Sequence, residues 1–307
     1  MQIIEIMDDL FFIERGWLNA NHFVHVSTEP ILIDTGYKAD ADVTMEQIEK
    51  LGVRISNVSL IINTHTHCDH VGANRIIYEQ SGCDIALHTV GRHFIETKDA
   101  WATWWDYYNQ EADFFVCTRS LEDGDILKVG PHEFQVIYTP GHASDGIVLY
   151  NHKQKLLISS DTLWENDMAV MTQRVEGSLA LFSAKKSLEK IAPLDVRQVY
   201  PGHGGPFRDF EAALSKAMER IDRCMEDREI IGKDLIKKII VYTLLMKKSM
   251  NEQDFFPYLM ETVWFRETVD LYFNSEYEII YQQIMDTFIQ NKVVRIENNC
   301  LFTLIKP

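Results

Sequence analysis

Apolar, β-rich segments of this 307-residue chain end repeatedly in short turns that carry histidine or aspartate. The most concentrated case is the segment 60–63, which leads into residues 64–70 with the sequence THTHCDH. Three later strand-like segments end in the same manner, at residues 139–142 (TPGH), 159–162 (SSDT) and 200–204 (YPGHG). A rigid sheet can hold side chains at such positions with high precision. The repeated pattern therefore predicts a layered fold whose strand ends carry metal ligands.

The THTHCDH segment predicts how its own ligands are arranged. In an extended chain, residues i and i+2 project to the same face, so His65 and His67 are expected to point together. Gly72 permits a turn after them, which would bring Asp69 and His70 to an adjacent point. Four ligands so placed can serve two neighbouring metal positions. The alternative is a polar strand end whose histidines are simply solvated, and the three downstream turns favour the metal interpretation.

The order of elements in the first two hundred residues favours an α/β fold. Apolar residues spaced near 3.6 predict helices over residues 41–51, 73–80 and 179–191. Short apolar runs bounded by turn residues predict strands between these helices. The predicted strands are residues 3–6, 10–14, 31–34, 60–64, 85–88, 134–139, 147–150, 156–160 and 196–200.

These motifs resemble, in kind and in order, those of the metallo-β-lactamase fold superfamily. The resemblance spans residues 31–205, more than half of the chain. It implies an α/β fold, the four-layer αββα sandwich, with metals held at one edge of the paired sheets. Residues 1–207 would then form the catalytic domain. The matching segments are residues 33–36 (IDTG), 64–70 with Gly72, 140–142 (PGH), 160–162 (SDT) and 201–204 (PGHG).

The resemblance also implies two metal sites. Imidazole and carboxylate ligands without thiolate suit zinc, iron or manganese, and we favour two zinc ions. Asp34 matches a position that supports the site without binding metal, and Cys68 matches a variable position to which we assign no role. The implied ligands are His65, His67 and His142 for the first metal; Asp69, His70 and His203 for the second; and Asp161 as the bridge between them.

The implied activity is hydrolysis by a hydroxide that bridges the two metals, because a metal ion lowers the pKa of its bound water to about 7. Asp69 is a further catalytic candidate, since it can orient the nucleophile. An aspartate at the position of Asp161 is typical of the glyoxalase II and lactonase-like branch, and true metallo-β-lactamases lack it. Histidine at position 67 disfavours the di-iron flavoprotein branch. The predicted substrate is therefore a thioester, an ester or a lactone.

Residues 94–116 are rich in aromatic side chains. One interpretation is a helix whose aromatic stripe fills the core. The other is a cap whose aromatic side chains line a substrate pocket, and the two are compatible. This cap insert predicts a small-molecule substrate with an apolar acyl portion. The predicted pocket residues are Trp101, Trp104, Trp105 and Tyr108, together with Trp164.

The last hundred residues, 208–307, are predicted to form a separate, mostly helical domain. A long helix at 209–231 precedes helices at 234–247, 252–263 and 276–291. The apolar runs 293–297 and 300–305, joined by Asn298 and Asn299, predict a hairpin because asparagine tolerates positive φ. Three helices followed by a hairpin is the order of a winged helix, which serves in nucleic-acid binding, in packing or in dimer formation.

Two other activities remain open at this point. Some relatives with a C-terminal winged helix are metal-dependent ribonucleases or phosphodiesterases. Residues 208–307 carry a net charge of −3, so they lack the excess of basic residues that nucleic-acid binding requires. This favours a C-terminal domain that packs on the rest of the chain or forms a homodimer. The other alternative is a mononuclear iron dioxygenase acting on persulfides through His65, His142 and Asp161. The complete second set of ligands argues against it, and against a non-catalytic binding module.

The whole chain has a net charge of −16, which repels polyanions and disfavours nucleic acid as a partner. Five cysteines without a C-x-x-C pair suit a reducing compartment. Four acidic residues precede the first basic residue, Arg15, which is the reverse of a secretory signal. The apolar run at 239–246 is too short to cross a membrane. We therefore expect a cytoplasmic protein.

Overall fold

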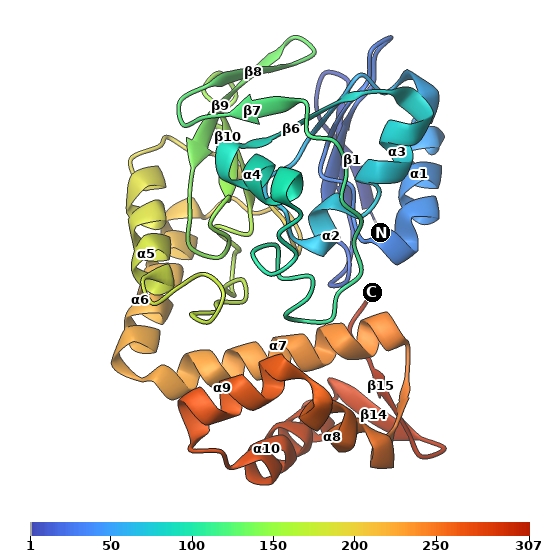
Figure 1. Cartoon of the computed structure of the whole chain (residues 1–307). Coiled ribbons are helices and arrows are strands. Elements are labelled where there is room, and N and C mark those ends of the chain that lie inside the picture. Colours follow the sequence, from blue (N-terminus) through green and yellow to red (C-terminus); the bar gives the residue numbers. More distant parts are fainter. Residues whose placement is uncertain (1) are drawn as a thin grey trace.

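The computed structural model describes residues 2–307, and two β-sheets packed face to face form its centre (Figure 1). Within these residues the first sheet has seven strands, which neighbour one another in chain order. The first four run antiparallel, and the last four are parallel. Their bounds are β1 (Gln2–Met7), β2 (Leu10–Glu14), β3 (His22–His25), β4 (Ile31–Ile33), β5 (Leu60–Ile62), β6 (Asp84–His88) and β7 (Arg119–Leu121).

The second sheet has five strands in the described part of the chain, in the order β12-β11-β10-β9-β8. Its β11–β12 pair is parallel, and its other pairs are antiparallel. The bounds are β8 (Ile126–Val129), β9 (His132–Tyr138), β10 (Ile147–Asn151), β11 (Leu156–Ser160) and β12 (Gln198–Pro201).

Alternation along the strands explains why the two sheets face each other. In β5, Leu60 and Ile62 pack in the apolar cluster between the sheets, whereas Ile61 packs in the outer cluster beneath the helices. In β11, Leu156 packs between the sheets and Leu157 packs outwards. Successive side chains of a strand point to opposite faces, so a strand apolar at every position must be covered on both sides.

Helices supply that cover on both outer faces (Figure 1). Helices α1, α3 and α4 bury Ile48, Ile77 and Ile95 against the first sheet. Helices α5 and α6 pack on the second sheet. The bounds are α1 (Ala41–Lys50), α2 (Cys68–Val71), α3 (Asn74–Ser81), α4 (Thr89–Thr97), α5 (Ala180–Ile191) and α6 (Phe210–Glu226), with 3₁₀ helices η1 (Lys38–Asp40) and η2 (Ile55–Asn57). The predicted four-layer αββα sandwich is confirmed.

Three strands of the sandwich escaped prediction, for identifiable reasons. The β3 strand has histidine at both ends, yet all four of its residues are buried, so its sequence shows no alternation. The β7 strand has three residues, two of them exposed. The β8 strand is short and opens the hairpin with β9.

The helix suggested for residues 94–116 does not form beyond Thr97, where α4 ends. Lys98 adopts a left-handed conformation that terminates the helix, and residues 98–118 contain neither helix nor strand. Trp104 and Asn109 also have positive φ angles, of 71° and 53°. The segment is nevertheless packed, because Trp104 and Tyr108 are 3% and 1% exposed.

The C-terminal region is mostly helical, as predicted, with two differences. The helix predicted over 209–231 is interrupted at Asp227, which is extended and whose side chain caps the next helix by accepting a hydrogen bond from Glu229 N. Helix α9 was not predicted; it follows extended Thr262. The elements are α7 (Arg228–Lys247), β13 (Met250–Asn251), α8 (Glu252–Glu261), α9 (Val263–Phe273), α10 (Tyr277–Gln290), β14 (Val294–Glu297) and β15 (Cys300–Thr303).

The three short C-terminal strands pair in the order β13-β15-β14. The winged-helix assignment and the domain boundary at residue 207 stay predictions. Helix α6, which follows that boundary, packs with α5 on the second sheet. None of the helices in the described part of the chain combines the length and apolar character that a membrane crossing requires.

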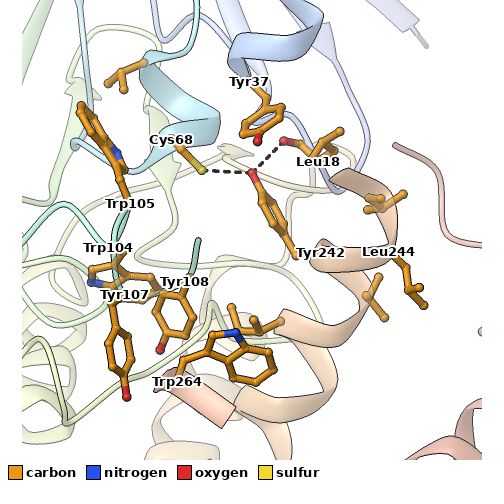
Figure 2. Packing of buried hydrophobic residues seen from close by; sticks show 14 of the residues in the cluster. Leu18, Tyr37, Cys68, Trp104, Trp105, Tyr107, Tyr108, Tyr242, Leu244 and Trp264 are labelled. Carbon is orange, nitrogen blue, oxygen red and sulfur yellow. Dashed lines mark hydrogen bonds between the residues drawn. The ribbon is translucent and has the colours of Figure 1, made fainter. Parts of the chain in front are cut away.

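Helix α7 lies beneath the sandwich and joins it to the remaining C-terminal helices (Figure 1). Tyr242 of α7 reaches the sandwich, where its hydroxyl donates to Leu18 O at 3.2 Å and lies 3.3 Å from Cys68 Sγ (Figure 2). On the other side of the same apolar cluster, Trp264 packs against Tyr108 with ring centroids 6.1 Å apart. Helix α7 thus lies in an apolar cluster with partners from the sandwich and from the C-terminal helices, as a helix buried on most of its faces requires.

Replacing Tyr242 by phenylalanine should lower the free energy of unfolding by about 1 kcal/mol, because Leu18 O and Cys68 lose a buried hydrogen-bond partner. Urea unfolding measures the loss, with the same dependence of the unfolding free energy on urea concentration expected in both proteins. Tyr258→Phe is the matched control, since Tyr258 is only partly buried and its ring packs under Lys247. Equal unfolding free energies for both variants would contradict the role of the Tyr242 hydroxyl.

Candidate metal centre

A single carboxylate contacts both ends of the loop that carries the THTHCDH motif. Asp34 follows β4 and has a φ angle of 59°. It accepts hydrogen bonds from Thr64 N at 2.9 Å and Thr64 Oγ1 at 2.8 Å, and it contacts His70 Nδ1 at 2.8 Å. One side chain therefore positions both ends of the motif. A left-handed aspartate is uncommon and is tolerated where the surroundings determine it.

The seven predicted ligands converge at one end of the sandwich. In three overlapping groups, the candidate ligand atoms all lie within 4.8 Å of one another. Each predicted ligand belongs to at least one group, although they come from four separate segments of the chain. The groups are His65, His67 and His142; His65, His70 and Asp161; and Asp69, His70 and His203.

Asp161 lies between the groups. Its Oδ2 is 3.4 Å from His142 Nε2, 3.6 Å from His70 Nε2 and 3.8 Å from His203 Nε2. Burial alone would raise the pKa of Asp161, but the charges of His203 and His70 together hold it well below its usual range. Asp69 Oδ2 lies 3.0 Å from His203 Nε2. The carboxylates thus occupy the space between imidazoles of different segments.

Four of the histidines are oriented by an oxygen at the ring nitrogen remote from the cluster. Such a contact favours the tautomer with its proton on Nδ1 and turns Nε2 towards the cluster, where a metal can bind. The contacts are His65 Nδ1 with Thr64 Oγ1 at 3.2 Å, His70 Nδ1 with Asp34 Oδ2 at 2.8 Å, His142 Nδ1 with Val170 O at 2.6 Å, and His203 Nδ1 with Gly16 O at 3.1 Å.

Buried nitrogens without partners indicate that the cluster suits metal ions. Within residues 2–307, the Nε2 atoms of His65, His67 and His70 are buried and have no hydrogen-bond partner. Leaving such an atom unpaired costs about 1–3 kcal/mol. Burial, together with the neighbouring imidazoles, lowers the pKa of His65 and His67 well below the usual value. Both rings are therefore neutral, which is the form that binds metal.

A cavity of about 50 Å³ opens beside these ligands. Two of the predicted pocket residues, Trp104 and Trp164, line it, and Trp164 Nε1 donates to Asp161 Oδ1 at 3.3 Å. A second cavity of about 350 Å³ shares Trp17, Trp164 and His203 with the first. A volume of that order is typical of small-molecule sites.

The other three predicted pocket aromatics do not line this cavity. Trp101 is 39% exposed and packs between Tyr107 and Arg174. Trp105 Nε1 donates to a backbone oxygen, Thr66 O, at 3.0 Å. Tyr108 packs into the core next to Trp264, as described above. Their pattern in the sequence did not separate them from Trp104, because residues 98–118 fold irregularly.

Several pocket residues were not predicted at all. Trp17 follows β2, and its ring lies 5.5 Å from that of His203. Helix α7 contributes Lys238, Ile239 and Tyr242 to the cavity wall. Lys238 is 8% exposed, and its amine donates to Asp234 Oδ2 at 2.8 Å. A lysine inside an apolar helical run was the one available signal. A helix whose packing partners lie far away in the sequence cannot be placed from spacing alone.

Sequence comparison finds hydrolases among the relatives. The model of the metallo-beta-lactamase superfamily matches residues 19–203. A probable metallo-hydrolase of Bacillus subtilis is 26% identical over 227 residues, which cover 64% of this chain and 70% of that protein. A hydroxyacylglutathione hydrolase of Rhizobium etli is 31% identical over 173 residues, which cover 55% of this chain and 58% of that protein.

Solved structures share the fold at low sequence identity. A metallo-beta-lactamase family protein of Thermus thermophilus matches 97% of this chain and 100% of its own length, with a TM-score of 0.63 and 18% identity. A subclass B3 metallo-beta-lactamase from a soil metagenome matches 77% of this chain and 98% of its own length, with a TM-score of 0.59 and 20% identity. The superfamily model covers more than half of the chain and contains every ligand segment, so this protein belongs to the metallo-beta-lactamase superfamily.

Proposed function

We propose that this protein is a hydrolase with two divalent metal ions, acting on an acyl thioester, ester or lactone. The observation that carries the proposal is the position of Asp161, whose Oδ2 lies within 4 Å of imidazole nitrogens from both sets of histidines. A carboxylate so placed can bridge two cations. The relatives named hydroxyacylglutathione hydrolase support a thioester as the first substrate class to test.

In this proposal His65, His67 and His142 hold one cation, and Asp69, His70 and His203 hold the other. Zinc suits this donor set, and iron and manganese are alternatives. Bound there, two such cations would supply hydroxide at neutral pH and polarise a carbonyl oxygen.

The chain's own residues perform the remaining tasks. Asp69 lines the cavity, and we propose that its carboxylate also orients the attacking water. Trp17, Trp164 and Ile239 offer apolar surface beside the ligands, which suits an apolar acyl portion. Lys238 is neutralised by Asp234 and Asp167, so it gives the pocket little net positive charge.

A phosphodiester substrate is the second candidate. The C-terminal region favours it, because helices α8, α9 and α10 are followed by the hairpin β14–β15, with β13 paired to β15. This order of helices and strands is like that of a winged helix, a module that can bind nucleic acid. The net charge of −3 over residues 208–307 opposes it.

The first test loads purified protein with Zn²⁺ and assays a panel of acyl thioesters, aryl esters, lactones and single-stranded RNA. We expect about two ions per chain and turnover of at least one acyl substrate. Loaded protein that cleaves none of the acyl substrates would overturn the proposal, and cleavage of RNA alone would establish the second candidate. Oxygen uptake with a glutathione persulfide would instead indicate a dioxygenase.

Replacing Asp161 by alanine should lower both the metal content and kcat/KM, the latter by more than about 100-fold, because both sets of histidines lose the shared carboxylate. Metal analysis and steady-state kinetics measure the two effects. Asp195→Ala is the control, since Asp195 is an exposed carboxylate paired with Lys155 on the surface. Full metal content and activity in Asp161→Ala protein would exclude the bridging role.

Replacing Asp34 by alanine removes none of the seven ligand residues, yet it should weaken Zn²⁺ binding about 10- to 100-fold, because His70 loses the acceptor at Nδ1. Competition with a chromophoric chelator measures this affinity without any substrate. An unchanged dissociation constant would show that Asp34 only stabilises the loop.

A further inference from the structure

His67 differs from the other histidines of the cluster. Its Nδ1 lies 2.9 Å from His142 Nε2, and its Nε2 has no partner within residues 2–307. Within residues 2–307, neither nitrogen of His67 has a hydrogen bond to an oxygen atom, whereas each of the other four imidazole rings contacts an oxygen through Nδ1. Hydrogen bonding to protein oxygen therefore does not set the plane of the His67 imidazole.

An indole ring takes the place of the missing oxygen. The ring centroids of Trp104 and His67 lie 3.9 Å apart, with an angle of 38° between the ring planes. The centroids of Trp104 and His142 lie 5.1 Å apart. Trp104 has a φ angle of 71°, which is a rare conformation for a bulky residue and persists where the surroundings enforce it. The contacts of the indole should therefore account for its position.

Glu176 provides the directional contact. Trp104 Nε1 donates to Glu176 Oε1 at 2.6 Å. Burial raises the pKa of Glu176 to about 8; the hydrogen bond from Trp104 opposes this rise, and the charge of Asp145 adds to it. The carboxyl group is thus largely protonated at neutral pH, and a neutral amide is its closest mimic.

We propose that Glu176 is a positioning residue of the metal centre, which holds the indole of Trp104 against His67 and thereby orients this imidazole for metal binding. The proposal rests on the proposed metal function of the cluster. Glu176 lies 34 residues beyond His142 and contacts none of the predicted ligands directly. Asp34 contacts the ligand His70 itself. Glu176 instead acts on His67 through Trp104.

The test measures the binding of Zn²⁺ by chelator competition and the visible absorption of Co²⁺-loaded protein, both without substrate. Glu176→Ala should weaken binding by roughly 10- to 100-fold and change the Co²⁺ spectrum, because His67 loses its support. Glu176→Gln should stay within about threefold of the original protein, since its amide oxygen can still accept from Trp104.

Glu267→Ala is the matched control. Glu267 accepts a hydrogen bond from Tyr107 Oη in the same aromatic segment, but it does not contact Trp104 or the cluster. Its replacement should leave the affinity and the spectrum unchanged, whatever it does to thermal stability.

A mutant cycle with Trp104→Phe tests whether Glu176 works through the indole. Phenylalanine keeps an aromatic ring but has no N–H, so adding Glu176→Ala to it should weaken binding no further. Effects that multiply in the double variant would overturn the proposal. So would a Glu176→Gln variant as defective as Glu176→Ala, or a Glu176→Ala variant that binds like the original protein.

These outcomes are separable from the fate of the proposed function. Unchanged affinities in the Glu176 variants of a Zn²⁺-binding protein would reject only the positioning role. A protein that binds Zn²⁺ as expected but cleaves no acyl substrate would reject only the hydrolase. A protein that fails to bind Zn²⁺ at all would reject both.

Discussion

Burying five imidazoles and two carboxylates side by side is unfavourable unless their lone pairs accept hydrogen bonds or bind cations. The cluster between the strand ends has this problem in concentrated form, because several of its nitrogens face one another without partners. Cations bound there would remove this cost, since each ligand atom would then have a positive neighbour. The surrounding sandwich is stiff enough to hold the ligands in place before any metal arrives, because strands apolar on both faces anchor each ligand segment.

The candidate ligand segments could be found in the sequence because each follows an apolar strand, whereas their division into two metal sites comes from the family resemblance and stays a prediction. Asp161 follows an apolar strand whose bounds, 156–160, are those observed for β11. His65 and His67 alternate after β5, and each glycine-containing turn follows its strand closely. The order of strands and helices predicted a layered α/β architecture, and the family resemblance supplied its four layers.

The pocket walls could not be predicted, because they depend on contacts between distant segments. Trp104 and Trp101 look alike in sequence, yet one packs on His67 and the other is partly exposed. A helical pattern was misleading there, since the left-handed Lys98 ends α4 and the chain continues irregularly. Ile239 and Tyr242 belong to a helix whose docking site is set by tertiary packing, which overrides local preference.

Helix α7 has one further consequence. It belongs to the same continuous apolar cluster as the outer layer of the first sheet, and it also forms a wall of the cavity. Residues of α7, beyond the predicted boundary at residue 207, therefore share one apolar cluster with the sandwich. A fragment that stops at residue 207 would expose the aromatic surface around Tyr108 to water and would lack one wall of the cavity, so the same helix covers apolar surface and shapes the candidate site.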